Sequence, residues 1–391
     1  MKAAVVTAEW APRPGYPLTE EEVKQRMARV GSSVWKHPVA VVQQIEDPTP
    51  GPEDVIVRVA AAGLCGSDLH FFETDAEGYM KYPGMARFPS VPGHEVAGEV
   101  VATGKNVKYL KAGDLVCLDD MVVCNRCEPC RRGFPNQCEN LEDVGFTMNG
   151  GCAELLQVPE RNCWNINALI ARFGDKQRTL EAGAIIEPFT VAYNALFECA
   201  ARIKPGAYAT VFGAGAIGLA VVQLLKATGA AKIILFEQNE GRRQLARQMG
   251  ATHVFGVTAN DLGQQKAHQV ILAETGGAGA DLHVECAGAF QHTLPEMEQA
   301  MANGSQIVII GRDSHRPALF LENFQVKKAN VIGAMGNTGY GTYPNVLRMI
   351  ASGALDPTPM ITDRFALDDF NQALARAKTR AGGKVLVQVH Q

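Results

Sequence analysis

The sequence predicts a two-domain α/β protein in which a compact all-β domain precedes a doubly wound parallel sheet. A length of 391 residues exceeds the size of most single hydrophobic cores, so we expect two domains. Short β-branched runs broken by proline and glycine lie between residues 39 and 118. From residue 209 onward, apolar strands alternate with helical stretches, which predicts βαβ units.

Composition and charge argue against two classes of partner. The chain is 47% hydrophobic and 20% charged, which is typical of a soluble globular protein. Its 37 basic and 41 acidic residues leave a net charge of −4, so we expect neither nucleic acid nor an anionic membrane as a partner. A small neutral molecule suits the chain better.

Targeting signals and cysteines indicate the compartment. Residues 1–7 lack the longer apolar core and the cleavage site of a secretory signal. The uncharged run 205–225 contains four glycines, which favours a buried strand, turn and helix over a membrane span. Ten cysteines without an export signal favour metal ligation over disulfides, and we predict a cytoplasmic protein.

The N-terminal third is predicted to begin with an insertion and to continue as strands. Residues 10–37 are mostly a polar insertion, in which Thr19 and Glu22 form a capping box for a short helix through roughly Ala28. The runs 55–59, 96–102 and 115–118 are apolar and β-branched. They predict strands of a compact domain that carries the functional motifs on its loops.

Two short motifs about two dozen residues apart contain zinc-ligand types. Cys65 lies in the segment 63–70, and His94 and Glu95 lie in the segment 92–95. A thiolate, an imidazole and a carboxylate can bind zinc and leave a fourth position for water or substrate, which is typical of a catalytic site. The alternative is that Cys65 is a small core residue and His94 a buried, hydrogen-bonded histidine.

A closely spaced cysteine lobe predicts a second, structural zinc site. The pattern C-x2-C-x2-C-x7-C consists of Cys124, Cys127, Cys130 and Cys138. Four thiolates can close a tetrahedral shell around one zinc ion and leave no position for substrate. An iron-sulfur cluster or a reactive thiol lobe are the alternatives.

One acid stands in an otherwise apolar stretch. Glu187 lies near the start of the segment 185–194. A buried carboxylate needs a partner, and a nearby zinc ion would supply one. A salt bridge or the start of a helix are the alternatives, because acids are favourable at helix N-termini.

A glycine-rich turn predicts dinucleotide binding. An apolar strand runs into G-x-G-x-x-G and then an apolar helix over residues 219–227; the predicted cofactor contacts here are Gly213, Gly215, Ala216, Ile217 and Gly218. Such glycines allow pyrophosphate to approach a helix N-terminus. Glu237 ends the next strand, 19 residues past Gly218, where a carboxylate can bind the ribose hydroxyls and favour NAD. Arg242 and Arg243 are the counter-indication, because a 2'-phosphate would bind arginine, although an exposed helix face would also explain them.

Further apolar strands complete the predicted parallel sheet. They precede Gly288 and Gly311, which we expect at the nicotinamide half of the cofactor. A helix over 343–352 and a strand over 384–389 follow. We therefore predict a catalytic domain of residues 1–190 completed by 342–391, with a dinucleotide-binding domain of residues 191–341 inserted in it.

These motifs together resemble one family. Over essentially its whole length the sequence is similar to the zinc-dependent medium-chain alcohol and polyol dehydrogenases. The resemblance rests on the segment 65–70, Gly93-His94-Glu95, the four-cysteine lobe, Glu187-Pro188 and the glycine turn. It implies a GroES-like β-barrel catalytic domain and a Rossmann domain, with the active site between them, two zinc ions per chain, and NAD.

The resemblance also implies roles for single residues. Catalytic zinc is expected on Cys65 and His94 with either Glu95 or Glu187; in the ethanol-type branch a cysteine takes the place of Glu187, so ethanol is a poor substrate candidate. The substrate proton would leave through the Ser67 hydroxyl, the cofactor ribose and His70, although His70 could also be a mere surface histidine. Asp68 would orient His94.

A finer resemblance concerns the substrate. The long N-terminal insertion and the segments 73–79, 133–140 and 336–344 are similar to those of inosose and cyclitol dehydrogenases. We therefore expect a polyol substrate, an inosose-type cyclitol first, and a homo-oligomer, either a dimer or a tetramer. Polar loop residues could bind its hydroxyl groups: Asp75, Glu77, Tyr79, Lys81, Arg87, Asn149, Asn337, Thr338 and Tyr340. Alternatively, these side chains are solvated and touch nothing.

Two other functions stay open. A threonine, sorbitol or sugar dehydrogenase would share every motif named above. A dinucleotide-binding zinc protein without catalysis is the alternative from another class, because a fold does not determine a function.

Overall fold

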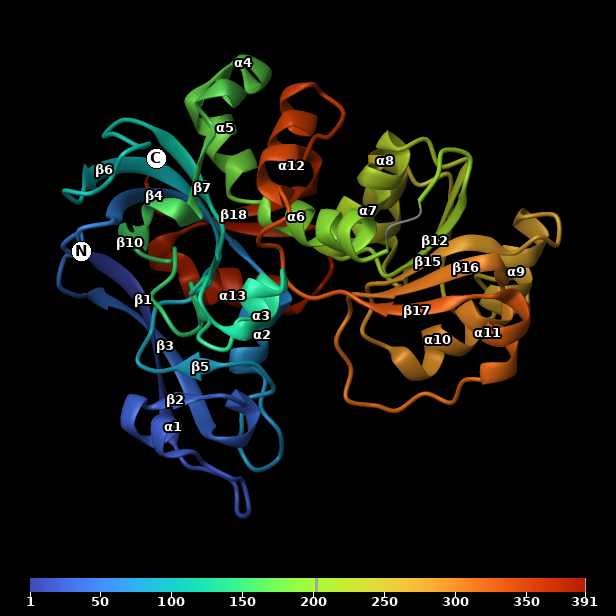
Figure 1. Ribbon diagram of the computed structural model, residues 1–391, viewed down its shortest axis with the longest axis horizontal. Coiled ribbons are helices and arrows are strands. Elements are labelled where there is room, and N and C mark those ends of the chain that lie inside the picture. The colour runs from blue at the N-terminus through green and yellow to red at the C-terminus, as the bar shows by residue number, and fades with distance from the viewer. Residues whose placement is uncertain (201–202, 391) are drawn as a thin grey trace. The chain divides into compact units, whose positions relative to one another are not determined.

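The computed structural model describes residues 1–200 and 203–390 and divides the chain into two compact units (Figure 1). Unit 1 comprises Met1–Glu187, Ile361–Arg380 and the chain from Lys384 onward, and unit 2 comprises Pro188–Met360 and Ala381–Gly383. Residues 342–360, which we expected in the first domain, therefore lie in unit 2. The Gln223 side chain holds them there, because it donates to Asp356 O at 2.6 Å and accepts from Asp356 N at 2.8 Å.

Unit 1 is built on a seven-stranded sheet in the order β11-β7-β6-β4-β19-β18, with β10 also paired to β4. Its strands are β4 (Asp54–Leu64), β6 (Glu95–Thr103), β7 (Leu115–Leu118), β10 (Leu155–Pro159), β11 (Cys163–Asn165), β18 (Ile361–Ala366) and β19 (Lys384–Gln388). The three predicted β-branched runs fall in β4, β6 and β7, and their valines pack together in a buried core. The predicted β-sheet of the first domain is confirmed, although the unit also contains helices and so is not all-β.

Short strands and helices surround this sheet. The strands are β1 (Lys2–Trp10), β2 (Met27–Ala28), β3 (Trp35–Gln44), β5 (Ala86–Arg87), β8 (Met121–Val122) and β9 (Glu142–Asp143). The helices are α1 (Glu20–Gln25), α2 (Gly66–Phe72), α3 (Glu128–Arg131), α4 (Ile170–Phe173), α5 (Lys176–Gly183) and α13 (Phe370–Lys378); α6 (Glu187–Tyr193) crosses into unit 2.

The N-terminal segment differs from its prediction in two ways. The capping box of Thr19 and Glu22 is present, but α1 ends at Gln25 rather than near Ala28. Arg26 adopts a left-handed conformation with φ of 50°, and Met27–Ala28 pairs with Ala86–Arg87 as a strand. The segment is also less polar than predicted, because Ala28, Val34 and Trp35 are buried in the core of unit 1.

Unit 2 contains a six-stranded parallel sheet in the order β14-β13-β12-β15-β16-β17. Its strands are β12 (Tyr208–Phe212), β13 (Lys232–Phe236), β14 (His253–Phe255), β15 (Ala280–Glu285), β16 (Met301–Ile309) and β17 (Asn330–Gly333). Its helices are α7 (Ala216–Ala227), α8 (Glu240–Met249), α9 (Ala267–Glu274), α10 (Phe290–Gln299), α11 (Leu321–Lys327) and α12 (Thr342–Ala351).

Helices cover both faces of this sheet: Figure 1 shows α7 and α8 over one face and α10 and α11 over the other. The strand order reverses between β12 and β15, and ligands of such sheets bind beyond the carboxyl ends of the strands at this point. The uncharged run 205–225 forms β12, the glycine turn and α7, as predicted. Among the described residues, each helix is too short or too polar to span a membrane.

Candidate functional site

Cys65 lies between a strand and a helix of unit 1. The strand β4 ends at Leu64, and Cys65 is the N-cap of α2. The Asp68 carboxylate accepts a hydrogen bond from Cys65 N at 2.8 Å, which satisfies an amide at the start of the helix. Asp68 therefore fixes the backbone on which the thiol is placed.

The same carboxylate holds the second motif. Asp68 Oδ1 accepts from Gly93 N at 3.3 Å and lies 3.7 Å from His94 Nδ1. Gly93 has φ of 97°, and a Cβ there would lie 2.9 Å from Cys152 Sγ, so this turn requires glycine. Asp68 thus links the loops that carry Cys65 and His94, in the position that the sequence predicted for a residue orienting His94.

Three predicted ligands converge. One donor atom each from Cys65, His94 and Glu95 lies within 4.8 Å of the others. Burial disfavours a thiolate, but the neighbouring His94 lowers the pKa of Cys65 below its ordinary value. Burial would also lower the pKa of His94, yet Asp68 and Cys65 raise it well above its ordinary value. Cys65 and His94 therefore each favour the charged form of the other.

Glu95 is bound on one side only. It is fully buried, and its Oε1 accepts from Lys384 Nζ at 2.5 Å. Its Oε2 is also buried and makes no hydrogen bond to any residue that the structure describes. Such an atom costs free energy unless a cation or a donor reaches it. Cysteine, histidine and carboxylate are zinc ligands, so this donor set fits a zinc ion.

Glu187 is the first residue of α6 and is buried, but it lies outside this group of three. Burial and then the charge of Asp120 raise the pKa of Glu187 well above its ordinary value, while His94 lowers it. Asp143 behaves alike, because burial and Asp120 raise its pKa. A surplus of buried acids around His94 favours a bound cation. The sequence reasoning overlooked Asp120 and Asp143, although the Asp119-Asp120 pair after β7 was a visible signal.

Ser67 and His70 lie on α2, beyond Cys65. The Ser67 Oγ atom is buried and has no hydrogen-bond partner among the described residues. His70 Nδ1 lies 2.9 Å from Glu73 Oε2, and Arg380 contacts the other oxygen of Glu73 at 3.3 Å. Glu73 therefore orients the His70 ring, a contact that the sequence did not indicate.

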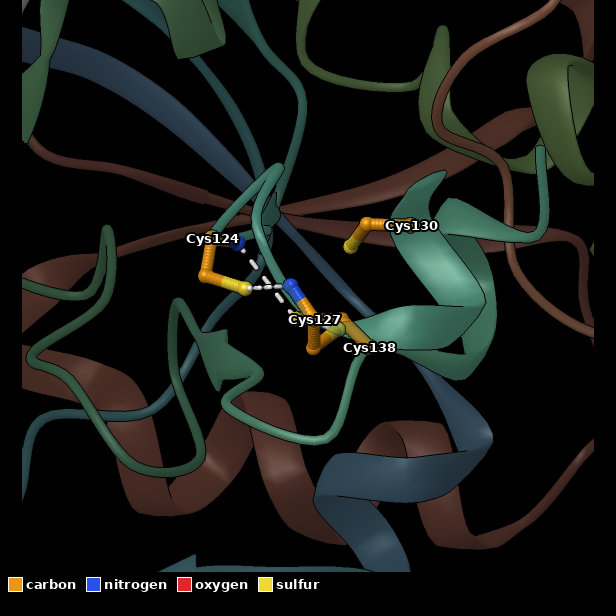
Figure 2. Close-up of side chains that lie close together, drawn as sticks. All are labelled: Cys124, Cys127, Cys130 and Cys138. Carbon is orange, nitrogen blue, oxygen red and sulfur yellow. Dashed lines mark hydrogen bonds between the residues drawn. The ribbon is translucent and has the colours of Figure 1, made fainter. Parts of the chain in front are cut away.

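The cysteine lobe forms the second donor set. Sulfur atoms of Cys124, Cys127, Cys130 and Cys138 lie within 4.8 Å of one another, and Figure 2 shows the four side chains pointing toward a common centre. The amides of Arg126 and Cys127 donate to Cys124 Sγ and lower the pKa of Cys124 to about 6. Burial raises the pKa of Cys130 to about 12. Four thiols arranged in this way fit one structural zinc ion.

Unit 2 holds the predicted dinucleotide contacts around one turn. Gly213 has φ of 95°, and a Cβ on Gly218 would lie 2.0 Å from Gly213 O, so both glycines are needed for close packing of strand and helix. A Cβ on Gly215 would meet nothing within 4 Å, which leaves space beside the N-terminus of α7. Ala216 and Ile217 begin this helix with amides that can bind pyrophosphate.

Glu237 follows β13 and is buried beside the glycine turn. Its two carboxylate oxygens accept from Ala214 N and Asn239 N, each at 2.8 Å. Arg242 Nε donates to Gly382 O at 2.9 Å, whereas Arg243 Nη1 donates to Glu237 O at 2.9 Å. Of the two arginines, Arg243 is thus the one shown to contact Glu237, and the cofactor contact predicted for Arg242 stays a prediction.

Gly288 and Gly311 lie together at the ends of β15 and β16. A Cβ on Gly311 would lie 2.6 Å from Gly288 N and 2.2 Å from Glu285 Oε2. The buried Glu285 carboxylate accepts from the amides of Ala287 and Gly288 and from Thr293 Oγ1. Glu285 thus organises this edge of the sheet, and the sequence reasoning did not single it out.

Several polar loop residues are engaged within unit 1. Asp75 and Glu77 form ion pairs with Arg13, and Arg87 forms one with Glu142. Asn149 Oδ1 accepts from Val91 N at 3.1 Å. These four side chains have partners within the protein, so the alternative that they touch nothing does not hold for them. Their contact with substrate hydroxyl groups stays a prediction.

The chain is similar to proteins of known family. Residues 51–168 match the alcohol dehydrogenase GroES-like domain, and residues 216–352 match the zinc-binding dehydrogenase domain. Scyllo-inosose 3-dehydrogenase of Thermotoga maritima is 36% identical over 400 residues, which cover 100% of this chain and 99% of that protein. L-threonine 3-dehydrogenase of Caldanaerobacter subterraneus is 33% identical over 88% of this chain and 93% of that protein.

A solved structure agrees with these matches. The structure of a putative alcohol dehydrogenase from Thermotoga maritima superimposes with a TM-score of 0.93 and 35% identity, and the match covers 99% of this chain and 100% of that one. Both donor sets for metal lie within the first matched segment. The similarity therefore includes the whole described architecture.

Proposed function

Because the chain belongs to the zinc-binding medium-chain dehydrogenases, we propose that it oxidises a secondary hydroxyl group of a polyol or cyclitol to a ketone and transfers hydride to NAD. The observation that carries the activity is the convergence of Cys65, His94 and Glu95 beside a buried Glu95 oxygen that lacks a donor. Membership in this family argues against a protein without catalysis.

We propose two zinc ions per chain. Cys65 and His94 with Glu95 or Glu187 would hold the catalytic ion, and the four cysteines of the lobe would hold the structural one. Bound zinc supplies Lewis-acid chemistry that makes a hydroxyl group acidic near neutral pH, and NAD supplies the hydride acceptor. Glu95 is favoured over Glu187 as the third ligand, because one of its carboxylate oxygens already lies within the donor group, whereas Glu187 lies outside it.

The protein's own residues would orient groups and move the proton. The Ser67 hydroxyl can accept the substrate proton, because its buried oxygen has no partner among the described residues. His70 can take it onward with the ring nitrogen that Glu73 does not contact. Asp68 holds both ligand loops and so preserves the distance between Cys65 and His94.

An inosose-type cyclitol is the first substrate candidate, because the similarity to a scyllo-inosose dehydrogenase spans both chains. Threonine is the second, because the similarity to a threonine dehydrogenase covers 88% of this chain. A homo-oligomeric dimer or tetramer and a cytoplasmic location stay predictions.

A substrate panel tests this proposal. We expect the highest kcat/KM with scyllo- or myo-inositol derivatives, less with sorbitol, and little with L-threonine or 2-propanol. The measurement is NADH formation at fixed NAD. A higher kcat/KM for threonine than for every polyol would instead assign the chain to the second candidate.

We also predict that Glu237 sets the NAD preference. Its carboxylate can accept hydrogen bonds from ribose hydroxyls and repels a 2'-phosphate. Glu237→Gln should raise the NADP to NAD ratio of kcat/KM by about 10- to 100-fold. Arg243→Gln is the matched comparison. If wild-type protein used NADP as well as NAD, Arg243 would dominate over Glu237.

A further inference from the structure

The N-terminal segment contacts a loop that begins and ends at the candidate active site. This loop, residues 73–82, closes on His70, whose carbonyl oxygen accepts from the amides of Lys81 and Tyr82 at 3.1 Å each. At one end Glu73 holds the His70 ring. At the other end the Tyr82 ring stacks on Phe146, which lies 4.8 Å from the His94 ring between centroids.

The tip of the loop is gathered around one arginine. Asp75 Oδ1 accepts from the amides of Glu77 and Tyr79 at 2.9 and 3.0 Å, so the tip folds around this carboxylate. Arg13 pairs with the other oxygen of Asp75 and with Glu77 Oε2 at 3.1 Å. Its guanidinium also lies over the Tyr79 ring, 3.7 Å from the centroid.

Arg13 is itself held by the N-terminal segment. Its Nε donates to Ser32 O at 3.1 Å, so each nitrogen of the guanidinium contacts a different group. Lys36 Nζ lies 4.3 Å from the centroid of the same Tyr79 ring. Backbone hydrogen bonds from His37 N to Gly78 O and from Met80 N to Trp35 O join the two segments.

We propose that Arg13 is a positioning residue, which fixes the loop 73–82. It thereby fixes the placement of His70 and of the stacked Tyr82 and Phe146 rings beside His94. An isolated surface ion pair contributes little, but here one guanidinium combines two carboxylates, an aromatic face and a carbonyl group. Most of the backbone pairing stays without it. Loss of Arg13 should therefore loosen the loop without unfolding unit 1.

Hydrogen exchange measures how firmly Arg13 holds the loop 73–82, and it does so independently of activity. In the full-length zinc-loaded protein, Arg13→Ala should speed amide exchange in residues 75–82 by about tenfold. Arg29→Ala is the matched control, because Arg29 lies in the same segment and, among the described residues, its ion pair is with Glu21, at 3.5 Å between exposed side chains. It should leave exchange in residues 75–82 unchanged. Unchanged exchange in Arg13→Ala would refute the proposal that Arg13 fixes the loop 73–82.

Kinetic measurements test the effect of Arg13 on catalysis, and this part of the test rests on the proposed function. Arg13→Ala should lower kcat for the best substrate of the panel by about tenfold, because His70 is less well placed. Zinc content should stay at the wild-type value, and Arg13→Lys, which keeps the charge but not the planar fork, should recover part of kcat. Faster exchange with an unchanged kcat would refute positioning. A wild type that turns over threonine but no polyol would refute the proposed substrate and leave this test intact with threonine.

Discussion

Replacing Cys65 by serine should reduce kcat by about 10³-fold or more while the chain keeps its fold and one zinc ion. A serine hydroxyl does not ionise near neutral pH and is a poor zinc ligand, so one of three converging donors is lost. Serine is nevertheless a good N-cap, so α2 should persist with Asp68 still bound to the backbone at position 65. Elemental analysis and NADH formation measure the two effects.

Cys199→Ser is the control for this experiment. Cys199 is a partly buried free cysteine of unit 2 and belongs to neither donor set. The control should keep two zinc ions and full turnover. A wild-type protein that carries only one zinc ion, or a Cys65→Ser variant that keeps both ions and its turnover, would refute the assignment of Cys65 as a catalytic ligand.

Replacing Lys384 by methionine should lower the free energy of unfolding by about 3–5 kcal/mol when a chelator is present. Lys384 is 3% exposed and donates to Glu95, which is 0% exposed, so methionine would leave a buried carboxylate without its cation. With zinc bound, the loss should be smaller, because a second cation then lies near Glu95. Urea unfolding with and without chelator measures both values.

Two comparison variants make this prediction specific. Lys176→Met makes the same substitution in an exposed pair with Glu99, and it should cost less than about 1 kcal/mol. The double variant Lys384→Met with Glu95→Gln removes the buried charge as well, so it should recover much of the lost stability. Equal losses in the free energy of unfolding for Lys384→Met and Lys176→Met would show that the buried pair matters no more for stability than the exposed one.

Local motifs were predictable because neighbouring residues determine them. The capping box of Thr19 and Glu22 is separated by three positions, and the glycine turn requires small residues at fixed spacing next to a strand. The alternating strands and helices after residue 208 predicted the parallel sheet of unit 2. The end of α1 was missed, because pairing of Met27–Ala28 with a distant strand overrode the helical signal.

The sequence by itself determined which residue types could bind zinc and a dinucleotide, because these chemistries require particular ligands at short spacing. Only the tertiary structure decided which buried groups became partners. Glu95 pairs with Lys384 from 289 positions away, and Arg13 reaches Asp75 from 62 positions away. The sequence around a single lysine or arginine does not indicate its partner. The Lys384 contact arises only when β19 packs on β4. The Arg13 contact arises only when the N-terminal segment pairs with residues 78–87.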